Sequence, residues 1–557
     1  MKNKLLCHKT AGFIICVVLV AALLAVSCSS TASTTPTTAT TSTAATANTP
    51  SQTKPATTTA APVTTAPATT QIKPATTTSS NKYGGTLRVI DPFIPAQPIG
   101  APYEAPLAVP SMQAVLAKII GQKADGTLQP ELALSWDQDT SAATPSITFH
   151  LRQGVTFHDG SAFNAQAVKW NLEKQKAGNL FNTTIYFKSF DVIDDYTIRV
   201  NLTEWRNAFP PSFAGIQGYM ASPTAFDKNG IDYVRWHMVG AGAFTQADFQ
   251  RDVSLTTVKY PNYYEAGKPY LDGIQFLYVA DPITRQVLWR SGGGDVMNVD
   301  AQTASLFAAS GNQIKSIPNA TLCLFPDSVN TTSAWSNLKV RQAVEYALDK
   351  EAIVKAFGYG YYTAAYQIPS KNSSAYDPTI PGRKYDLAKA KQLMTDAGYS
   401  NGFKSSLIAP SSTSRDLMAI LQSYLSKIGI TVDIQLPEAA KFSSYMGGTW
   451  DNAVLVGSVI EIANYNLSFN NFLNYPVTLY RSAARPDNWP DLYKATLTSK
   501  DVDPKLQQAA VHALYDQLTA IPLYNTQSTW VVSDKLQDSG IGNKVLYWDS
   551  QNAWLSK

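Results

Sequence analysis

The segment GYSNG at residues 398–402 matches the G-x-S-x-G pattern of serine hydrolases. In those enzymes the serine attacks a carbonyl carbon from a sharp turn that joins a strand to a following helix. Here the apolar spacing predicts a helix before the turn, and Gly398 stands where a glycine commonly ends a helix. The order of the elements is therefore wrong for a nucleophile. An extracellular serine hydrolase built around Ser400 is the weaker of the functional hypotheses.

Histidines and a glycine-rich turn are the other places where chemistry could occur. None of the histidine pairs has the i, i+4 helical spacing of a metal site, and no H-E-x-x-H motif is present. The histidines in question are His150, His158, His237 and His512. The segment SGGGD at residues 291–295 lacks the glycine spacing and the lysine of a phosphate-binding loop. The sequence therefore predicts turns and ordinary packing at these positions, with no metal site and no cofactor.

The composition is that of a large, nearly neutral globular protein. The chain has 557 residues and a formal net charge of +4, with 45% hydrophobic and 15% charged residues. Much of the positive charge lies at the start of the chain, at Lys2, Lys4 and Lys9. The rest shows no basic stripe of the kind that binds nucleic acid, so we expect no such partner. The four cysteines are too few and too scattered for a disulfide framework or a zinc site.

Residues 1–28 have the layout of a secretory signal peptide. A basic start precedes an apolar run from Ala11 to Val26, and the run ends shortly before Cys28. The ending resembles a bacterial lipobox, which implies that Cys28 carries a lipid in the mature protein. An uncleaved membrane anchor is the alternative, although the run is a little short for a span of ~20 residues. We expect an extracytoplasmic body, either lipid-anchored to the outer face of the cytoplasmic membrane or periplasmic.

Residues 29–81 consist almost wholly of Thr, Ala, Ser and Pro. Such a segment has nothing to pack and cannot offset the entropy of ordering, so its composition predicts a disordered linker. O-glycosylation of its hydroxyl groups is an alternative use that the sequence leaves open.

The body that follows the linker mixes short strands with amphipathic helices. Its clearest unit is a predicted strand at 404–409, a helix at 416–428 and a second strand at 430–434. Gly429 is placed to end the helix, and this order of elements implies a right-handed parallel crossover. The same spacing predicts two further helices, at residues 339–348 and 387–397. The predicted fold class is therefore mixed α/β.

Eight segments of the body follow one another in a recognisable order. They are GGTLRV (84–89), DGTLQPELALSW (125–136), ITFHLRQGVTFHDGSAFNAQAVKWNLE (147–173), VGAGAF (239–244), LKVRQAVEYALDKEAIV (338–354), YDLAKAKQLMTDAGY (385–399), KIGITVDIQ (427–435) and IPLYN (521–525). Together they resemble the extracellular solute-binding proteins of family 5, the dipeptide, oligopeptide and nickel type that serve ABC importers. The resemblance covers nearly all of residues 82–557.

The resemblance implies a two-lobed α/β fold of the periplasmic-binding-protein type II kind, which closes on its ligand. It implies a first lobe at 82–320, a second lobe at 321–520 and a return to the first lobe at 521–557. An extra subdomain of the first lobe is expected at about 109–224. The resemblance also implies a monomer that performs no chemistry and delivers a solute to an ABC permease in the membrane.

In peptide-binding members of this family, the motif G-W-x-A-D-Y-x-x-P holds an aspartate that pairs with the α-ammonium group of the peptide. The matching segment here is 457–466, so Asn464 stands in place of the aspartate and Ser458 in place of the tryptophan. An amide can hydrogen-bond an ammonium group but cannot neutralise it. Glu461 could supply the missing charge, although a solvated loop carboxylate is its alternative role. Otherwise the ligand is neutral at this point, or it is a peptide in another orientation.

The other candidates for the ligand site are mostly aromatic or basic side chains. An aromatic ring can stack on a ligand, and an arginine can pair with a carboxylate. The candidates besides Ser458, Glu461 and Asn464 are Tyr103, Trp450, Gly457, Tyr465, Arg481, Arg485 and Tyr524. For each aromatic or arginine, a place in the core or at the surface is the alternative. We expect peptides or a related small solute as the ligand, with an oligosaccharide or a nickel chelate as alternatives.

Overall fold

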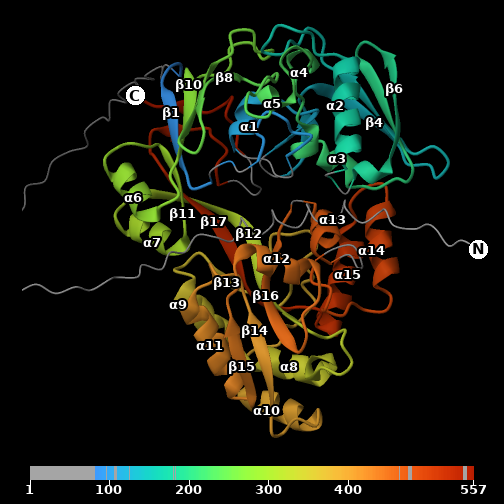
Figure 1. Ribbon diagram of the computed structural model, residues 1–557, viewed down its shortest axis with the longest axis vertical. Helices are drawn as coiled ribbons and strands as arrows, with labels where there is room; N and C mark the ends of the chain where they lie inside the picture. Colours follow the sequence, from blue (N-terminus) through green and yellow to red (C-terminus); the bar gives the residue numbers. More distant parts are fainter. Residues whose placement is uncertain are drawn as a thin grey trace, which may run out of the picture. The chain divides into compact units, whose positions relative to one another are not determined.

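The computed structural model describes residues 82–557, apart from 94, 96, 106–109, 124–125, 180, 182, 463, 474–478 and 543–547 (Figure 1). The predicted signal peptide at 1–28 with its lipid on Cys28, and the predicted linker at 29–81, lie outside the described residues and stay predictions. Within the described part of the chain, no helix has both the length and the apolar character needed to cross a bilayer.

A sheet of eleven strands runs through the described structure. Its order is β15-β14-β16-β12-β17-β11-β1-β10-β9-β8, and β13 pairs with β17 beside this path. In the same order, the strands are β15 (Ile430–Gln435), β14 (Phe403–Ile408), β16 (Ala453–Ile460), β12 (Gln313–Pro326), β17 (Ile521–Val532), β11 (Val296–Val299), β1 (Thr86–Asp91), β10 (Gly273–Tyr278), β9 (Ser254–Lys259), β8 (Phe244–Gln250) and β13 (Thr363–Ala364). Parallel and antiparallel pairs both occur, as in a mixed α/β sheet.

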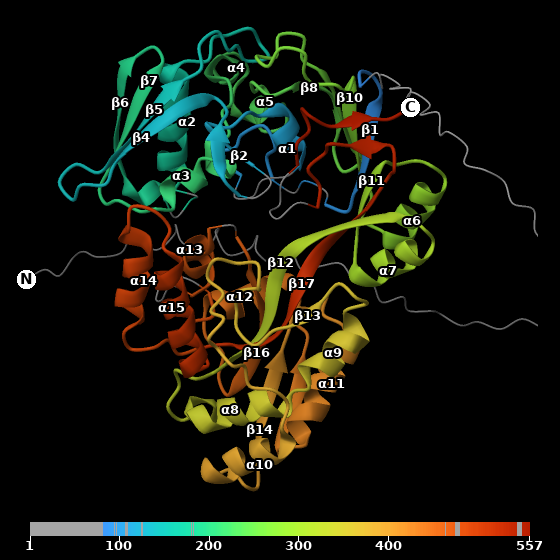
Figure 2. The same cartoon turned by 180° about the vertical axis from the view of Figure 1, so that it is seen from behind.

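The long strands β12 and β17 connect the two halves of this sheet. They pair with each other in antiparallel register, from Gln313 opposite Val532 to Leu324 opposite Ile521. The later half of β12 also pairs with β16, and the later half of β17 pairs with β11. Figure 2 shows both strands extending from one half into the other. We call the half with β14, β15 and β16 the second lobe, and the half with β1 and β8 to β11 the first lobe.

A separate sheet of four strands belongs to the first lobe. Its strands, in spatial order, are β4 (Ala133–Asp139), β5 (Ser146–Leu151), β7 (Thr197–Leu202) and β6 (Phe187–Asp194). Alternate residues such as Phe149 of β5 and Val200 of β7 are buried in one cluster with Val168 and Leu172 of helix α2 (Ala165–Gly178). This alternation follows from the two-residue period of a strand that has one buried face. The four strands and α2 therefore have a hydrophobic core of their own.

Helices flank the sheets in both lobes (Figure 1). Besides α2, the first lobe contains α1 (Pro110–Val115), α3 (Phe209–Ser212), α4 (Pro223–Asn229), α5 (Ile231–Val234), α6 (Pro282–Arg290) and α7 (Ala301–Ala309). The second lobe contains α8 (Leu338–Ala347), α9 (Lys350–Phe357), α10 (Leu387–Asp396), α11 (Arg415–Ser426), α12 (Ala439–Gly447), α13 (Tyr465–Ser468), α14 (Trp489–Thr498) and α15 (Pro504–Gln517). Two short strand pairs join β2 (Ile120–Gln122) to β3 (Leu128–Pro130), and β18 (Leu536–Gln537) to β19 (Trp554–Leu555). The helices predicted at 339–348 and 387–397 are confirmed as α8 and α10, and each end agrees to within one residue.

The predicted β-α-β unit of the second lobe is confirmed. The chain runs through β14, α11 and β15, and β14 pairs with β15 in parallel register. Leu417, Leu421 and Leu425 are buried on α11. Gly429 has a φ of +83° after the helix, a conformation that residues with a side chain rarely adopt. A Cβ atom on Gly402 would lie 1.8 Å from the carbonyl oxygen of Gly429, so the close approach of these two backbones also requires glycine.

The serine segment at 398–402 lies between α10 and β14. A helix therefore enters the turn and a strand leaves it, as the sequence predicts. This order is the reverse of the strand–turn–helix arrangement that exposes a nucleophilic serine.

A buried cluster of three charged residues lies in the second lobe. The carboxylate of Glu345 accepts from Nζ of Lys350 at 3.0 Å and from Nη1 of Arg383 at 2.9 Å. The side chains of Glu345 and Lys350 are fully buried, and Nζ of Lys350 also donates to the carbonyl oxygen of Ala365. The cluster joins the last turn of α8 to the start of α9 and to Arg383 in the segment before α10, and the local sequence gives no sign of it.

Asp91 ends strand β1 with its side chain buried. Its Oδ1 accepts the backbone N–H of Phe93 at 2.9 Å, and the guanidinium of Arg285 also favours the charged carboxylate. Burial outweighs both effects and raises the pKa of Asp91 to about 6. The folded protein therefore binds this proton more tightly than the unfolded chain does.

We expect Asp91→Asn to flatten the pH dependence of stability between about pH 4 and pH 6. Protonation favours the folded state, so the Asp91 contribution to the free energy of unfolding is lost as the pH rises through its folded-state pKa. The loss is at most about 3 kcal/mol in this window. Urea unfolding of wild type and variant at several pH values checks the difference. Parallel curves for the two proteins would show that the Asp91 carboxyl titrates normally.

Candidate functional site

The segment that resembles the ligand-binding motif begins inside strand β16. This strand is buried between β12 and β14, and Gly457 lies in its middle. The ring of Tyr480 crosses the strand there, and a Cβ atom on Gly457 would lie 2.5 Å from the Tyr480 hydroxyl oxygen. That hydroxyl donates to the carbonyl oxygen of Ser458 at 2.9 Å, and the ring stacks on Phe325. Packing against Tyr480 is therefore a sufficient reason for glycine at position 457.

Glu461 follows β16 and is held by another part of the second lobe. Its carboxylate accepts the backbone N–H of Ser370 at 3.1 Å and the Ser370 hydroxyl at 2.8 Å. Burial raises the pKa of Glu461, while the two bonds from Ser370 oppose that rise. Each carboxylate oxygen of Glu461 thus already accepts one hydrogen bond from Ser370. The role of Glu461 as a partner for a ligand amine stays a prediction, and a ligand would have to share the carboxylate with Ser370.

Asn464 is only 6% exposed and is the N-cap residue of the short helix α13. Its Oδ1 accepts the backbone N–H of Asn466 at 3.1 Å. Its Nδ2 has no acceptor among the described residues. A buried donor without a partner costs about 1–3 kcal/mol, so an oxygen atom of a ligand placed there would be stabilised. The arrangement can receive a carbonyl or carboxylate group more readily than an ammonium group.

The aromatic candidates fall into three separate clusters. Trp450 and Tyr465 are buried together in the apolar cluster beneath β16. Tyr524 lies on β17 in another cluster of the second lobe and stacks on Tyr362, with ring centroids 5.2 Å apart. Tyr103 is buried in the first lobe with Trp170, and their centroids are 5.5 Å apart. The structure therefore brings only one pair of these four rings into one cluster, and contact of any of them with a ligand stays a prediction.

Arg485 has an extensive set of backbone contacts. Its guanidinium donates to the carbonyl oxygens of Phe472, Leu473, Leu479, Tyr480 and Ala483. These bonds engage all three guanidinium nitrogens, and they tie together the segment around α13 and the residues before α14. The geometry supports a structural role for Arg485. Arg481 is half-buried four residues earlier in the chain, and its part in ligand binding stays a prediction.

The histidines have ordinary structural surroundings. His158 lies in the predicted turn, where Nε2 contacts the carbonyl oxygen of Gly242 at 3.0 Å and Nδ1 accepts the N–H of Gly240 at 3.4 Å. Burial lowers the pKa of His158 to about 4, so the imidazole is neutral at physiological pH. His150, His237 and His512 contact Asp137, Tyr233 and Asp377, respectively. Across the described ranges, no three His, Cys, Asp or Glu side chains are grouped closely enough to hold a metal ion.

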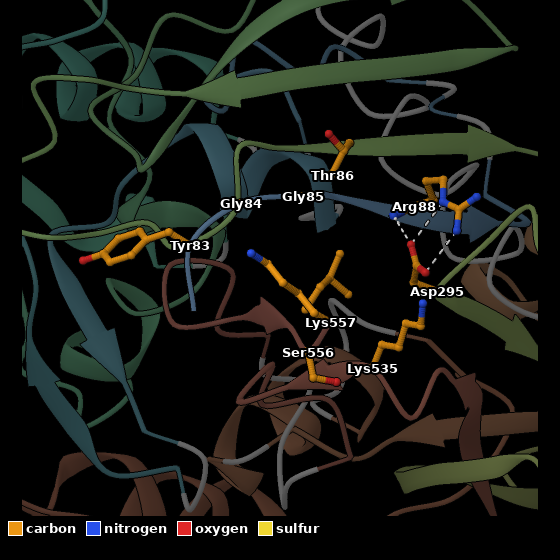
Figure 3. Close-up of a pocket in the computed structure, with 10 residues that line it drawn as sticks. Tyr83, Gly84, Gly85, Thr86, Arg88, Asp295, Lys535, Ser556 and Lys557 are labelled. Carbon is orange, nitrogen blue, oxygen red and sulfur yellow. Dashed lines mark hydrogen bonds and ion pairs between the residues drawn. The ribbon is translucent and has the colours of Figure 1, made fainter. Parts of the chain in front are cut away.

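An open pocket lies where the described chain begins and ends (Figure 3). Residues 83–86 and Lys557 line it together with Arg88, Asp295 and Lys535. The guanidinium of Arg88 pairs with the Asp295 carboxylate at 3.2 Å. These two side chains therefore neutralise each other within the pocket. None of the ligand candidates from the sequence lines this pocket.

A direct polar contact between the two lobes was not predicted from the sequence. Asn207, which follows β7 in the first lobe, bonds to Asn466 and to the end of α14 in the second lobe. All three of Asn207, Asn466 and Gln507 are buried amides in this contact. Asn207 lies 259 residues from Asn466, and Asn466 lies 41 residues from Gln507, so no local motif contains all three. Only their burial in the folded chain marks these three amides as partners.

The family assignment rests on a match over residues 127–474, which is more than half of the chain. The matching profile describes the bacterial extracellular solute-binding proteins, family 5. The chain belongs to this family. The family predicted from the sequence is thereby confirmed. The two-lobed α/β fold that it implies is confirmed by the similarity to the two solved structures described next.

One sequence relative and two solved structures of similar fold carry different ligands in their names. The glutathione-binding protein GsiB of Pectobacterium atrosepticum is 30% identical over 59% of the chain and 65% of its own length. The chain thus spans slightly less than two thirds of that relative. The structure of DppA from Helicobacter pylori with the peptide STSA is 20% identical, with a TM-score of 0.71 over 86% of this chain and 99% of DppA. NikA from Brucella suis with Fe(III)-EDTA is 21% identical, with a TM-score of 0.72 over 83% and 98% of the two chains.

Proposed function

We propose that this protein is the extracellular solute-binding component of an ABC importer, which captures a small solute between its lobes and delivers it to a membrane permease. The observation that carries the proposal is the family match over residues 127–474. The strands β12 and β17 support it, because two long strands that pass between lobes can bend as a hinge. The protein acts as a monomer in this proposal and performs no chemistry itself.

The proposal includes the organisation predicted from the sequence. A lipid on Cys28 anchors the protein outside the cytoplasmic membrane, and residues 29–81 act as a flexible tether. The first lobe comprises residues 82–320 and 521–557, and the second lobe comprises residues 321–520. An extra subdomain at about 109–224 contains the four-stranded sheet. The partners are the solute and the permease, without nucleic acid.

Peptides, or related small molecules with amide and carboxylate groups, are the proposed solutes. The relatives named for glutathione and for a peptide support this class. The unpartnered Nδ2 of Asn464 adds a preference for a ligand oxygen at that point. A metal chelate is the second candidate, because NikA holds Fe(III)-EDTA in a similar fold. An oligosaccharide is the third, and no observation in the described residues favours it over the other two.

Thermal unfolding of the full chain with a panel of solutes tests the proposal. The panel contains glutathione, di- to tetrapeptides with free and with acetylated amino ends, oligosaccharides, and a nickel–histidine chelate. A ligand at ~100 times its dissociation constant adds ~2.7 kcal/mol of stability, so it raises the melting temperature measurably. We expect peptides or glutathione to do so. A rise with sugars alone would contradict the peptide class, and ester hydrolysis that disappears in Ser400→Ala would instead support a hydrolase.

A further inference from the structure

Two residues of the first lobe, Trp205 and Asn207, contact the second lobe directly. Nδ2 of Asn207 donates to the carbonyl oxygen of Thr496 at 2.7 Å and to Oγ of Ser499 at 3.0 Å. The backbone N–H of Asn207 donates to the carbonyl oxygen of Leu497 at 2.9 Å. Nε1 of Trp205 donates to the carbonyl oxygen of Ser499 at 3.3 Å. Helices α3 and α14 lie close together in both ribbon views, in agreement with these bonds (Figures 1 and 2).

These first-lobe residues satisfy the end of a second-lobe helix. Thr496 and Leu497 lie in the last turn of α14, where no N–H group of the helix itself is available to donate to their carbonyl oxygens. Asn207 provides N–H groups to both carbonyls, one from its side chain and one from its backbone. If the lobes separate, both carbonyl groups lose Asn207; the Leu497 carbonyl must then bind water, whereas the Thr496 carbonyl keeps its bond from Asn466. The last turn of α14 is therefore a direct reporter of whether the lobes are in contact.

A chain of buried amides extends the contact into the second lobe. Nδ2 of Asn466 donates to Oδ1 of Asn207 at 3.0 Å and to the Thr496 carbonyl oxygen at 2.7 Å. Nε2 of Gln507 donates to Oδ1 of Asn466 at 2.9 Å. Asn207 is 3% exposed, and Asn466 and Gln507 are 0% exposed. In so buried a place, an amide that loses its hydrogen-bond partner costs more free energy than any one of these bonds contributes. Each amide therefore depends on the others.

We propose that these residues form a latch that sets how tightly the lobes stay closed on a solute. The latch consists of Trp205, Asn207, Asn466, Thr496, Ser499 and Gln507. Its polar groups exchange protein partners for water when the lobes part, so the contact is reversible. One member of the latch, Asn466, lies two residues after Asn464, and its backbone N–H donates to Oδ1 of Asn464. A solute held at Asn464 would therefore stabilise the same turn as the latch, and this coupling rests on the proposed function.

The substitution Asn207→Asp tests the latch. It keeps the shape of the side chain, removes its N–H donors and places a carboxylate against the oxygens of Thr496, Ser499 and Asp501. We expect hydrogen exchange of the full chain without ligand to be about tenfold faster at residues 203–212 and 489–501. We also expect every solute that binds wild type to bind about ten- to a hundredfold more weakly, and by the same factor, because the latch contacts none of them.

Two further variants keep the test decisive. Asn229→Asp makes the same substitution in the first lobe, where Nδ2 donates to the Ala225 carbonyl within α4, and it should change neither readout. Trp205→Phe keeps an aromatic ring at this buried position but removes the Nε1–H donor and part of the indole volume, and it should change both readouts a few-fold in the same direction as Asn207→Asp. If Asn207→Asp and Trp205→Phe both show wild-type hydrogen-exchange rates and wild-type solute affinity, the proposed latch is wrong. A loss confined to one solute would also overturn it, because Asn207 would then be a ligand contact.

The two readouts separate the latch from the proposed function. Hydrogen exchange is measured without any solute, so faster exchange in both latch variants supports the latch by itself. If wild type binds no solute of the panel while exchange still rises in the variants, the contact between the lobes stands and the proposed function fails.

Discussion

Replacing Glu345 with glutamine should lower the free energy of unfolding by about 3–5 kcal/mol. Glu345 is the only carboxylate within salt-bridge distance of Lys350 and Arg383 among the described residues. The Lys350 side chain is fully buried, so the glutamine variant leaves an ammonium group without a counter-charge in the interior. Breaking one side of a buried ion pair is far more costly than replacing the whole pair with apolar side chains. Urea unfolding at neutral pH measures the loss.

Glu351→Gln is the matched control for this experiment. Glu351 lies in the first turn of α9, next to Lys350 in sequence, but it is exposed, and its carboxylate accepts from the Tyr366 hydroxyl at 3.2 Å. Its replacement should cost no more than about 1 kcal/mol, as for other exposed charges. Replacing Lys350 with methionine in the Glu345→Gln background should recover part of the loss. Equal midpoints for Glu345→Gln and Glu351→Gln would show that the cluster does not depend on its carboxylate.

Replacing Trp450 with alanine should destabilise the protein by about 3–5 kcal/mol while the folded fraction keeps its solute affinity. Trp450 is 2% exposed and belongs to the apolar cluster beneath β16, together with Tyr465, Trp489 and Phe442. Removing so large a side chain leaves a cavity that the surrounding residues fill only in part. The melting temperature and the affinity for a solute found in the panel are the two measurements.

The opposite result for Trp450 would support its sequence-based role in the ligand site. Its Nε1 has no acceptor among the described residues, and a ligand oxygen would explain that feature. Trp450→Phe keeps most of the packing and removes the donor, so it separates the two roles. Unchanged stability with weakened binding in Trp450→Phe would place the indole against the solute. Reduced stability in Trp450→Ala, with unchanged binding in both variants, would place it in the core.

Local patterns in the sequence predicted the local elements of the second lobe well. Leu417, Leu421 and Leu425 recur at helical spacing, and β14 and β15 on either side of α11 form the expected parallel pair. Short-range spacing determines such elements, because the buried face of a helix or strand repeats every few residues. The long strands β12 and β17 are different. β12 pairs with β16 of the second lobe, β17 pairs with β11 of the first lobe, and the two strands pair with each other, so their arrangement depends on the whole chain.

The candidate site could be predicted only as far as its motif. The segment 457–466 led to Asn464, and the structure adds that Asn464 caps α13 and keeps one donor free of any described acceptor. The contact of Glu461 with Ser370 could not be read from the motif, since Ser370 lies 91 residues away. The bond between Asn207 and Asn466 spans 259 residues. Neutral amides show no charge pattern in a sequence, so only the folded structure reveals that they are partners.

Native mass spectrometry of the full chain, purified without denaturation, tests most directly whether this protein binds a small solute. The account predicts a second population that is heavier by the mass of one solute. It also predicts that collisional activation releases a molecule whose fragments contain amino acids. Added glutathione or a short peptide should convert the lighter population into the heavier one. A single population that none of these solutes shifts, or a released molecule that fragments only into sugar units, would contradict the account.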